Sequence, residues 1–333
     1  MPDYKKLLST LILASLPLTA FSQPAELLSP FSISSRHPLV EIYGLPDAQS
    51  AQLLPTGYSR FALQTAVANN FSYSDGTKEN IFIDGETRSI KLTWQKGISD
   101  DVELGLSLPY LSHSGGQLDG LINDWHDLFS LPDANRPDFP SNQLQFSYRK
   151  DGQLVVSLTQ AAKGIGDLGL NAGYQLAETA TRQWALRSQL KLPTGDPDKL
   201  LGSGSTDLAL SLNLSDRSWL GNRDIVIHAS TGGLWMNNGE VLASMRKNWV
   251  IFGSFTLGWR AADAISLKLQ LDGHSAFYHS ALTQLGDASL QLSLGGAVKI
   301  NQQWTLELGV SEDVAVDTAP DVTFLIELRR WSF

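Results

Sequence analysis

The stretch DLALSLNL (Asp207–Leu214) alternates polar and apolar residues without a break. Successive side chains of a β-strand point to opposite faces, so its four leucines would share one face and the residues between them the other. Segments with the same period of two recur from residue 58 to the end of the chain, for example ISLKLQL (Ile265–Leu271) and SLQLSL (Ser289–Leu294). The chain is therefore predicted to be all-β.

The apolar faces could meet a second sheet, in a secreted β-sandwich or lectin-like module, or they could meet lipid, in a membrane barrel. The segments run for about 9–13 residues, long enough for tilted strands that cross a bilayer. The short connections are Lys96–Asp101, Lys150–Gly152, Glu178–Arg182, Asp216–Arg223, Arg260–Ala264 and Asn301–Gln303. The long ones alternate with them and are Ser72–Asn80, Ser112–Asn142, Pro193–Gly204, Met236–Asn248, Asp272–Gly286 and Glu312–Asp321. This alternation predicts a transmembrane antiparallel up-and-down β-barrel of about fourteen strands, with twelve as the alternative, in the outer membrane of a Gram-negative bacterium.

Aromatic residues support the membrane location. Six tryptophans fall near the strand ends on the short-turn side, which would be periplasmic: Trp94, Trp184, Trp219, Trp259, Trp304 and Trp331. The chain ends in Phe333, an aromatic C-terminus that would be recognised by the barrel-assembly machinery. In the last strand Trp331 has the opposite parity to Leu328, and a bulge near Arg329–Arg330 would reconcile them. The expected surroundings are outer-membrane lipid and lipopolysaccharide.

Composition and the N-terminus limit the possible classes of protein. A net charge of -9 argues against a nucleic-acid partner, and the absence of cysteine removes disulfides and thiolate metal sites. Residues 1–22 read as a signal peptide, with Lys5 and Lys6 before a short apolar core. Residues 23–57 would form a periplasmic or lumen-inserted segment, and residues 58–333 the barrel. No later apolar run approaches the roughly 20 residues of a membrane helix.

The polar faces of the strands carry charges of both signs, which would line the lumen. The candidate lumen residues are Arg60, Lys91, Glu103, Arg149, Asp167, Arg187, Lys191, Asp207, His228, Lys268 and Glu307. Charges that face inward need water or partners, so we expect either a hydrated interior or one packed with ion pairs. The mixed signs indicate no clear ion preference.

One long connection has helical periodicity. The stretch SHSGGQLDGLINDWHDLFSLP begins at Ser112, and its apolar residues Leu118, Leu121, Ile122, Trp125, Leu128 and Phe129 follow the spacing of an amphipathic helix. Asp119, His126 and Asp127 fall on the other side. A short helix is marginal in water, so its apolar stripe is expected to cover the barrel mouth as a lid. A purely structural cap is the alternative.

Other motifs favour structural interpretations. Gly164–Gly169 matches a dinucleotide fingerprint, but a strand rather than a helix follows, so we interpret it as a hairpin loop. Asp196 and Asp198 could bind calcium, although a solvated loop is the simpler interpretation. His228, near Asp224 and Ser230, is the best-placed histidine for catalysis, but we favour the interpretation of a hydrogen-bonded lumen histidine. We predict no catalytic residue, no metal and no cofactor.

Several stretches together resemble a known family. They are YGLPDAQSAQLLPTG (43–57), VANNFS (67–72), DGETR (84–88), LSHSGGQLDGLINDWHDLFSLP (111–132), GIGDLGL (164–170) and KLPTGDPDKLLGSGSTDLAL (191–210). They are similar to a proteobacterial outer-membrane family catalogued as domain of unknown function number 3187. The last two stretches also resemble outer-membrane transporters linked to aromatic degradation. Both resemblances imply an outer-membrane location, and neither implies a substrate.

These features predict a passive outer-membrane channel or transporter for small solutes, narrowed by the loop 112–142. A structural or adhesive outer-membrane protein with a filled lumen is the alternative, and an enzyme in the lumen is the third hypothesis.

Overall fold

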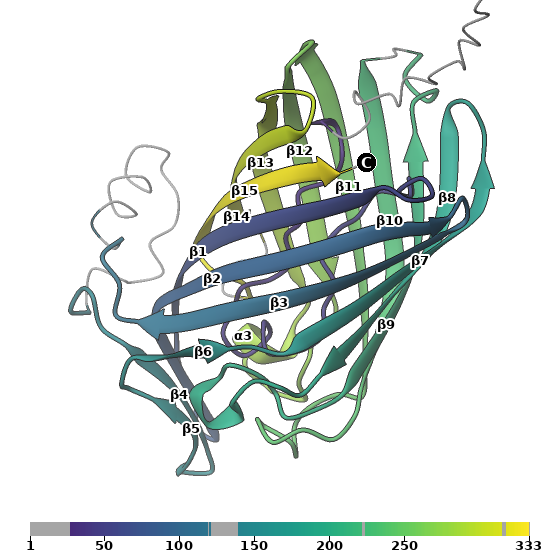
Figure 1. The fold of residues 1–333 in the computed structure, drawn as a ribbon. Coiled ribbons are helices and arrows are strands. Elements are labelled where there is room, and N and C mark those ends of the chain that lie inside the picture. Colours follow the sequence, from purple (N-terminus) through teal and green to yellow (C-terminus); the bar gives the residue numbers. More distant parts are fainter. Residues whose placement is uncertain (1–26, 119, 121–138, 222–223, 315–317, 333) are drawn as a thin grey trace, which may run out of the picture.

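A computed structural model describes residues 27–118, 120, 139–221, 224–314 and 318–332. In these residues, twelve antiparallel strands close into a barrel (Figure 1). The barrel strands, in order around the wall, are β1 (Ser59–Asp75), β2 (Glu79–Ser99), β3 (Val102–Ser114), β7 (Leu168–Glu178), β8 (Arg182–Leu192), β9 (Asp207–Asp216), β10 (Ile225–Met236), β11 (Trp249–Ala262), β12 (Ile265–His274), β13 (Ser289–Lys299), β14 (Trp304–Asp313) and β15 (Val322–Ser332). The prediction of a membrane barrel is confirmed, with twelve strands rather than fourteen.

The barrel closes because β1 pairs with both β2 and β15. The β1–β15 register runs without a shift from Ser59↔Ser332 to Asn69↔Val322. The prediction of a bulge near Arg329–Arg330 is therefore wrong. Instead, Trp331 turns to the inner side, where the Arg60 guanidinium lies 5.5 Å from its ring centre. A cation–π contact thus explains the odd parity of this tryptophan.

The period of two separates a lipid-facing surface from an interior. On β9, Leu210 is 47% exposed, whereas Asp207 is fully buried and Asn213 is 2% exposed. Exposed leucines on the outside and buried polar groups inside are the reverse of a water-soluble protein, and fit a wall between lipid and a polar lumen.

Three further strands explain the strand count. They are β4 (Gln145–Lys150), β5 (Gln153–Leu158) and β6 (Ala162–Ile165). The β4–β5 hairpin pairs with residues 79–84 of β2, at the end of the barrel that carries the long loops. The turn Lys150–Gly152, predicted on the periplasmic side, therefore lies on the opposite side. These three strands extend the sheet beyond the barrel wall, and they do not cross the membrane.

The glycine-rich stretch Gly164–Gly169 is not the hairpin that the sequence suggested. Both β6 and β7 pair antiparallel with β3, through Tyr110–His113 and Val102–Ser107. The two strands therefore follow one another along β3, and Gly166–Asp167 interrupts a single line of strand. The interruption turns the Asp167 side chain inward, where it meets Lys191.

Residues 27–57, called here the lumen segment, run from the end with the short turns to the end with the long loops and back, through the barrel interior (purple trace in Figure 1). Near the short turns, the Leu27 carbonyl accepts a hydrogen bond from Ser266 Oγ at 2.5 Å. At the other end, the Leu39 carbonyl accepts one from Tyr278 Oη at 2.6 Å. The chain then returns, and Gly57 donates its N–H to the Gly97 carbonyl at 2.9 Å before β1 begins. The lumen segment therefore has an ascending and a descending limb.

An apolar cluster covers the end of the barrel with the long loops. It joins the turn of the lumen segment (Leu39–Tyr43) to Val241–Met245, Phe277–Leu285 and the inner face of the β4–β5 hairpin. The long loops at this end of the barrel also contain the short helices η2 (Pro197–Lys199) and α3 (Thr283–Gly286). In the described part of the chain, no helix is long and apolar enough to cross a membrane.

Candidate functional site: the barrel lumen

The structure places most of the predicted lumen residues inside the wall. Glu103, Asp167, Arg187, Lys191, Asp207, His228, Lys268 and Glu307 are buried, and Arg60 and Lys91 are half-buried. Arg149 departs from the prediction, because it lies on β4, which extends the sheet sideways, and its side chain is exposed. In the described part of the wall, most of the inward charges form three groups of ion pairs, each of which also contacts the lumen segment. Lys91 pairs separately, with Asp47 of the lumen segment.

The first group lies near the periplasmic end, around Glu103. Its Oε1 accepts hydrogen bonds from Arg187 Nη1 at 2.9 Å and from Gln95 Nε2 at 3.0 Å, and its Oε2 accepts one from the Leu54 N–H at 2.9 Å. Arg187 also donates through Nε to the Ser50 carbonyl at 2.8 Å. One carboxylate and one guanidinium of the wall thus hold the descending limb.

The second group joins β12, β14 and β15 around Glu307. This carboxylate pairs with Lys268 and, at 2.9 Å, with Arg329. Arg329 also pairs with Glu327 and donates from Nη1 to Ser29 Oγ of the ascending limb at 2.8 Å. All four charged side chains are nearly inaccessible. Buried charges persist only when they are paired, and here two cations meet two anions.

The third group lies near the long loops, around Lys191. Its ammonium pairs with Asp167 and lies 3.3 Å from Asp207, and it donates to the Ile42 carbonyl at 3.1 Å. Asp207 Oδ2 accepts a hydrogen bond from the Gly44 N–H at 2.9 Å. This group therefore fixes the turn between the two limbs.

His228 forms hydrogen bonds to the lumen segment and to the wall. Its Nε2 lies 2.9 Å from the Leu28 carbonyl oxygen, and its Nδ1 lies 2.8 Å from Ser215 Oγ. With Nε2 donating to Leu28, the neutral ring accepts from Ser215, and it holds the start of the ascending limb. Ser230, its proposed neighbour, is instead bonded to Ser254 at 2.7 Å.

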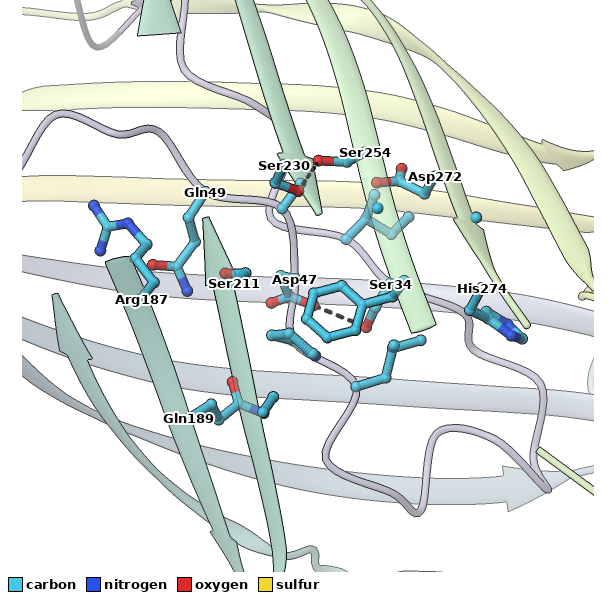
Figure 2. A pocket seen from close by; sticks show the side chains of 18 of the residues that line it. Ser34, Asp47, Gln49, Arg187, Gln189, Ser211, Ser230, Ser254, Asp272 and His274 are labelled. Atoms are coloured by element: carbon cyan, nitrogen blue, oxygen red, sulfur yellow. Dashed lines mark hydrogen bonds between the residues drawn. The ribbon is translucent and has the colours of Figure 1, made fainter. Parts of the chain in front are cut away.

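Two of the cavities in the described part of the chain lie between the lumen segment and the wall. The larger, of about 130 Å³, lies beside β1, β2, β3, β7 and β8, and Arg36, Glu41, Lys91 and Asn171 line it. The smaller, of about 30 Å³, is lined from the β8–β13 side by residues that include Asp272 and His274 (Figure 2). Asp47 lines both cavities, and its Oδ1 accepts a hydrogen bond from Ser34 Oγ at 3.0 Å.

The predicted lid falls mainly on residues that the structure does not describe. Asp119, Leu121, Ile122, Trp125, His126, Asp127, Leu128 and Phe129 lie outside the described residues, so the lid stays a prediction. Leu118 is described, and its N–H donates to Glu86 Oε1 at 2.6 Å. The buried carboxylate of Glu86 therefore anchors the start of this loop to β2.

Sequence reasoning did not find the charged residues that the lumen segment contributes to the interior. Arg36, Glu41 and Asp47 of the lumen segment pair with one another or with Lys91 of the wall. The sequence did contain an indication of this segment, because residues 27–57 mix apolar residues with charges and show no strand alternation. Such a stretch needs a surface to pack on, and the barrel interior supplies it.

The family assignment follows from a match over nearly the whole chain. The model of the family described as Protein of unknown function (DUF3187) matches residues 7–331. The chain belongs to the DUF3187 family. No curated protein matches this DUF3187 sequence.

Solved structures share the barrel fold with this DUF3187 protein. The COG4313 outer membrane channel from Pseudomonas putida F1 superposes with a TM-score of 0.56 at 13% identity, over 85% of this chain and 98% of that chain. The NanC porin gives a TM-score of 0.46 at 7% identity, over 82% of this chain and 100% of that chain. The toluene transporter TodX of Pseudomonas putida gives 0.38 at 12% identity, over 84% of this chain and 89% of that chain. At 13% identity, the likeness to the COG4313 channel is one of fold.

The DUF3187 protein is an outer-membrane β-barrel, and lipid and lipopolysaccharide are its surroundings. Recognition by the assembly machinery stays a prediction, and Phe333 lies outside the described residues. The resemblance stated from the sequence is confirmed at the level of the family.

Proposed function

We propose that this protein is a passive outer-membrane channel for small polar solutes, and that the lumen segment closes it in the conformation described here. The main support is the interior of the wall, which is polar and charged along its length. Side chains alone fill an eight-stranded barrel, whereas wider barrels enclose space for water or a plug. With twelve strands, this barrel holds a whole extra segment and still leaves a cavity of about 130 Å³.

The contacts of the lumen segment are of a kind that water can replace. Its apolar contacts inside the wall are small: Phe31 and Ile33 pack on Ala66 and Leu325, and Leu53 packs near Ala185. The turn Leu39–Tyr43 packs in the apolar cluster at the end with the long loops. Most of the other contacts of the two limbs are hydrogen bonds and ion pairs. The net contribution of a hydrogen bond is only about 0.5–1.5 kcal/mol, because water offers the same partners. Movement of the two limbs, with the turn Leu39–Tyr43 still packed in the apolar cluster, would therefore cost far less than unfolding of the wall.

A structural protein with a filled lumen is the second candidate. The same buried ion pairs support it, because each of the three groups joins the lumen segment to the wall. The two functions differ in one property. A channel requires the segment to move, and a structural barrel does not.

A disulfide that locks the ascending limb separates the two. The Cβ of Leu28 lies 3.3 Å from the position that a Cβ at Gly258 would occupy, slightly less than the separation within a disulfide. A Cβ at Gly258 would also lie 2.8 Å from the Leu28 carbonyl oxygen, so the limb must shift slightly in the variant, and the Gly258→Cys control reports the effect of that shift alone. The natural chain has no cysteine, so Leu28→Cys with Gly258→Cys introduces a single pair. The experiment is single-channel recording in planar bilayers, with the double variant oxidised and then reduced. Each single cysteine variant is the control.

The channel hypothesis predicts discrete conductance for the natural protein and for the reduced double variant, and its loss on oxidation. Conductance that is unchanged by the lock would show that the ascending limb is not the closure. No conductance in any folded sample would favour the structural protein.

The loop 112–142 is proposed as a second restriction, on the sequence pattern alone. Deletion of residues 116–138 should leave a heat-resistant barrel with a larger conductance, measured on the reduced double variant. An unchanged conductance would remove this loop from the mechanism.

A further inference from the structure

We propose that the outer face of the barrel binds one anionic phospholipid of the periplasmic leaflet. The site is a groove of about 560 Å³ on β14, β15, β1, β2 and β3, which lie side by side in the wall (Figure 1). Small-molecule pockets have volumes of about 300–1,000 Å³, so the groove is more than a gap between two side chains. The inference goes beyond the proposed function, because a site on the lipid-facing side requires neither a pore nor movement of the lumen segment.

An aromatic row forms the edge of the groove near the short turns. Across neighbouring strands, Arg330 lies opposite both Trp304 and Phe61, and Phe61 lies opposite Trp94. The Arg330 guanidinium lies 5.6 Å from the centre of the Trp304 ring. Rows of aromatic side chains mark the membrane interfaces of outer-membrane barrels, and the short turns of these barrels are periplasmic. The row therefore lies at the headgroup level of the periplasmic leaflet, which consists of phospholipid.

Arg330 is a cation on the lipid-facing side of the wall. Its neighbour Arg329 pairs with Glu307 inside the barrel, so strand parity turns Arg330 outward, and its side chain is exposed. An outward arginine is costly at the bilayer midplane and costs little only at the interface, where charged headgroups surround it. Among the described residues, no carboxylate pairs with Arg330. A lipid phosphate is the counter-ion that this position offers, and a guanidinium binds phosphate with two parallel hydrogen bonds.

Lys96 adds a second cation one row nearer the short turns. It lies opposite Ser59 of β1, and Ser59 lies opposite Ser332 of β15. Lys96 and Arg330 are therefore two strands and two residues apart, which puts their Cα atoms about 12 Å from each other. Both side chains are long enough to reach one headgroup between them. Within the described part of the chain, Lys96 also has no carboxylate partner.

The charge of the headgroup follows from these two cations. A zwitterionic phospholipid such as phosphatidylethanolamine would bring its own ammonium towards Arg330 and Lys96. Phosphatidylglycerol carries the same phosphate without an ammonium, so its net charge complements the site. The structure thus favours an anionic phospholipid over the zwitterionic one.

The acyl chains of this lipid would lie on the next row towards the bilayer centre, called here the leucine row. Its members are Leu328, Leu63, Leu92 and Leu108, which lie opposite one another on β15, β1, β2 and β3. All four line the groove. Apolar contact is not directional, so the leucine row accepts acyl chains of any lipid, and selection depends on the cations at the edge.

Native mass spectrometry of the delipidated, folded protein in detergent micelles tests the proposal. Phosphatidylglycerol and phosphatidylethanolamine with the same acyl chains are added in equal amounts, and the retained lipid is identified by its mass. We expect one phosphatidylglycerol per protein, retained at least about tenfold more than phosphatidylethanolamine. Dihexanoyl phosphatidylglycerol, whose chains are short, and inorganic phosphate should each compete at least about tenfold less well than the long-chain lipid.

Two variants locate the headgroup. Arg330→Gln and Lys96→Gln should each lower the preference for phosphatidylglycerol about fivefold, the contribution of one cation near an anionic lipid surface. The double variant should retain the two lipids equally. Arg182→Gln is the matched control, because Arg182 is exposed at the same end of the barrel but its charge is already compensated by Asp216 at 2.6 Å. This control should bind phosphatidylglycerol as the natural protein does.

Heat-modifiable migration on a gel verifies that each variant folds. Equal retention of the two lipids by the natural protein, or an unchanged preference in folded Arg330→Gln and Lys96→Gln, would overturn the proposal. An equal loss in Arg182→Gln would show attraction by charge in general and would also overturn it. So would displacement by inorganic phosphate as good as by the lipid, or a dimer without retained lipid, which would assign the groove to a second copy of the chain.

Discussion

Arg329 Nη2 lies 2.9 Å from Glu307 Oε1, and both side chains are buried inside the barrel wall. The two residues lie on neighbouring strands, and Arg329 extends further to Ser29 of the lumen segment. Glu307 also holds Lys268, so one carboxylate compensates two cations. This arrangement links the stability of the wall to the seating of the ascending limb.

Replacement of Glu307 by glutamine should destabilise the protein by about 3–5 kcal/mol, because it leaves the charges of Lys268 and Arg329 with Glu327 as their nearest remaining counter-ion. The measurement is the free energy of unfolding in urea, from protein folded into lipid vesicles. Glu178→Gln, with the same chemical change at an exposed position, should cost less than about 0.5 kcal/mol. Equal losses in the two variants would contradict a specific role for the buried pair.

The fold was predictable because one physical rule governs most of the chain. Leucines at every second position from 208 to 214 can face lipid only if the intervening residues face a polar interior. The strand count was less predictable. The segments at 145–150 and 153–158 have strand character, but whether a strand crosses the membrane depends on its partner. Besides its hairpin partner β5, β4 pairs with the outer end of β2. Alternation within a segment carries no information about that partner.

The candidate site was predictable in part, for a related reason. Strand parity placed Glu103, Lys191 and Glu307 on the polar faces of their strands, and all three side chains are buried. Their partners Leu54, Ile42 and Arg329 lie far away in sequence, and no local pattern specifies such contacts. The sequence did not predict an inward side chain at Arg329, because the expected bulge would have reversed the faces at the end of β15. The lid predicted in the loop 112–142 stays a prediction, because most of its residues lie outside the described part of the chain.

Leu210 lies near the middle of β9 and faces lipid. Leu210→Arg should therefore cost about 2–4 kcal/mol, the penalty for a cation at the bilayer midplane. Leu220, 54% exposed in the short turn after β9, is the matched position, and Leu220→Arg should cost little because water reaches it. Unfolding in vesicles measures both. Similar losses at the two positions would reject the placement of β9 across the membrane.

Asp151 lies in the β4–β5 turn, which the structure puts on the side of the long loops. A protease site inserted at Asp151 should therefore be cut when protease is added to intact cells. A site inserted at Asp263, in the short exposed turn between β11 and β12, should be protected until the outer membrane is opened. Cleavage at Asp263 and protection at Asp151 would reverse the orientation of the barrel.

His37 should make stability depend on pH. Its ring is 1% exposed, and burial, followed by repulsion from His274, lowers the pKa of His37 from 6.5 to about 3. The folded protein therefore holds His37 neutral while the unfolded chain takes up a proton below pH 6.5. This contribution to stability is complete above pH 6.5 and is lost, at about 1.4 kcal/mol per pH unit, as the pH falls towards 3.

The matched variant is His37→Asn, whose side-chain oxygen can accept from the Leu39 N–H as His37 Nδ1 does at 3.3 Å. Unfolding free energies in vesicles, measured from pH 7.5 to 4, should fall more steeply for the natural protein than for the variant. The steeper slope belongs to His37 because every other titrating group is common to both proteins. Parallel curves over this range would mean that His37 takes up its proton equally in the folded and unfolded states, so that the lumen segment at this turn is open to water.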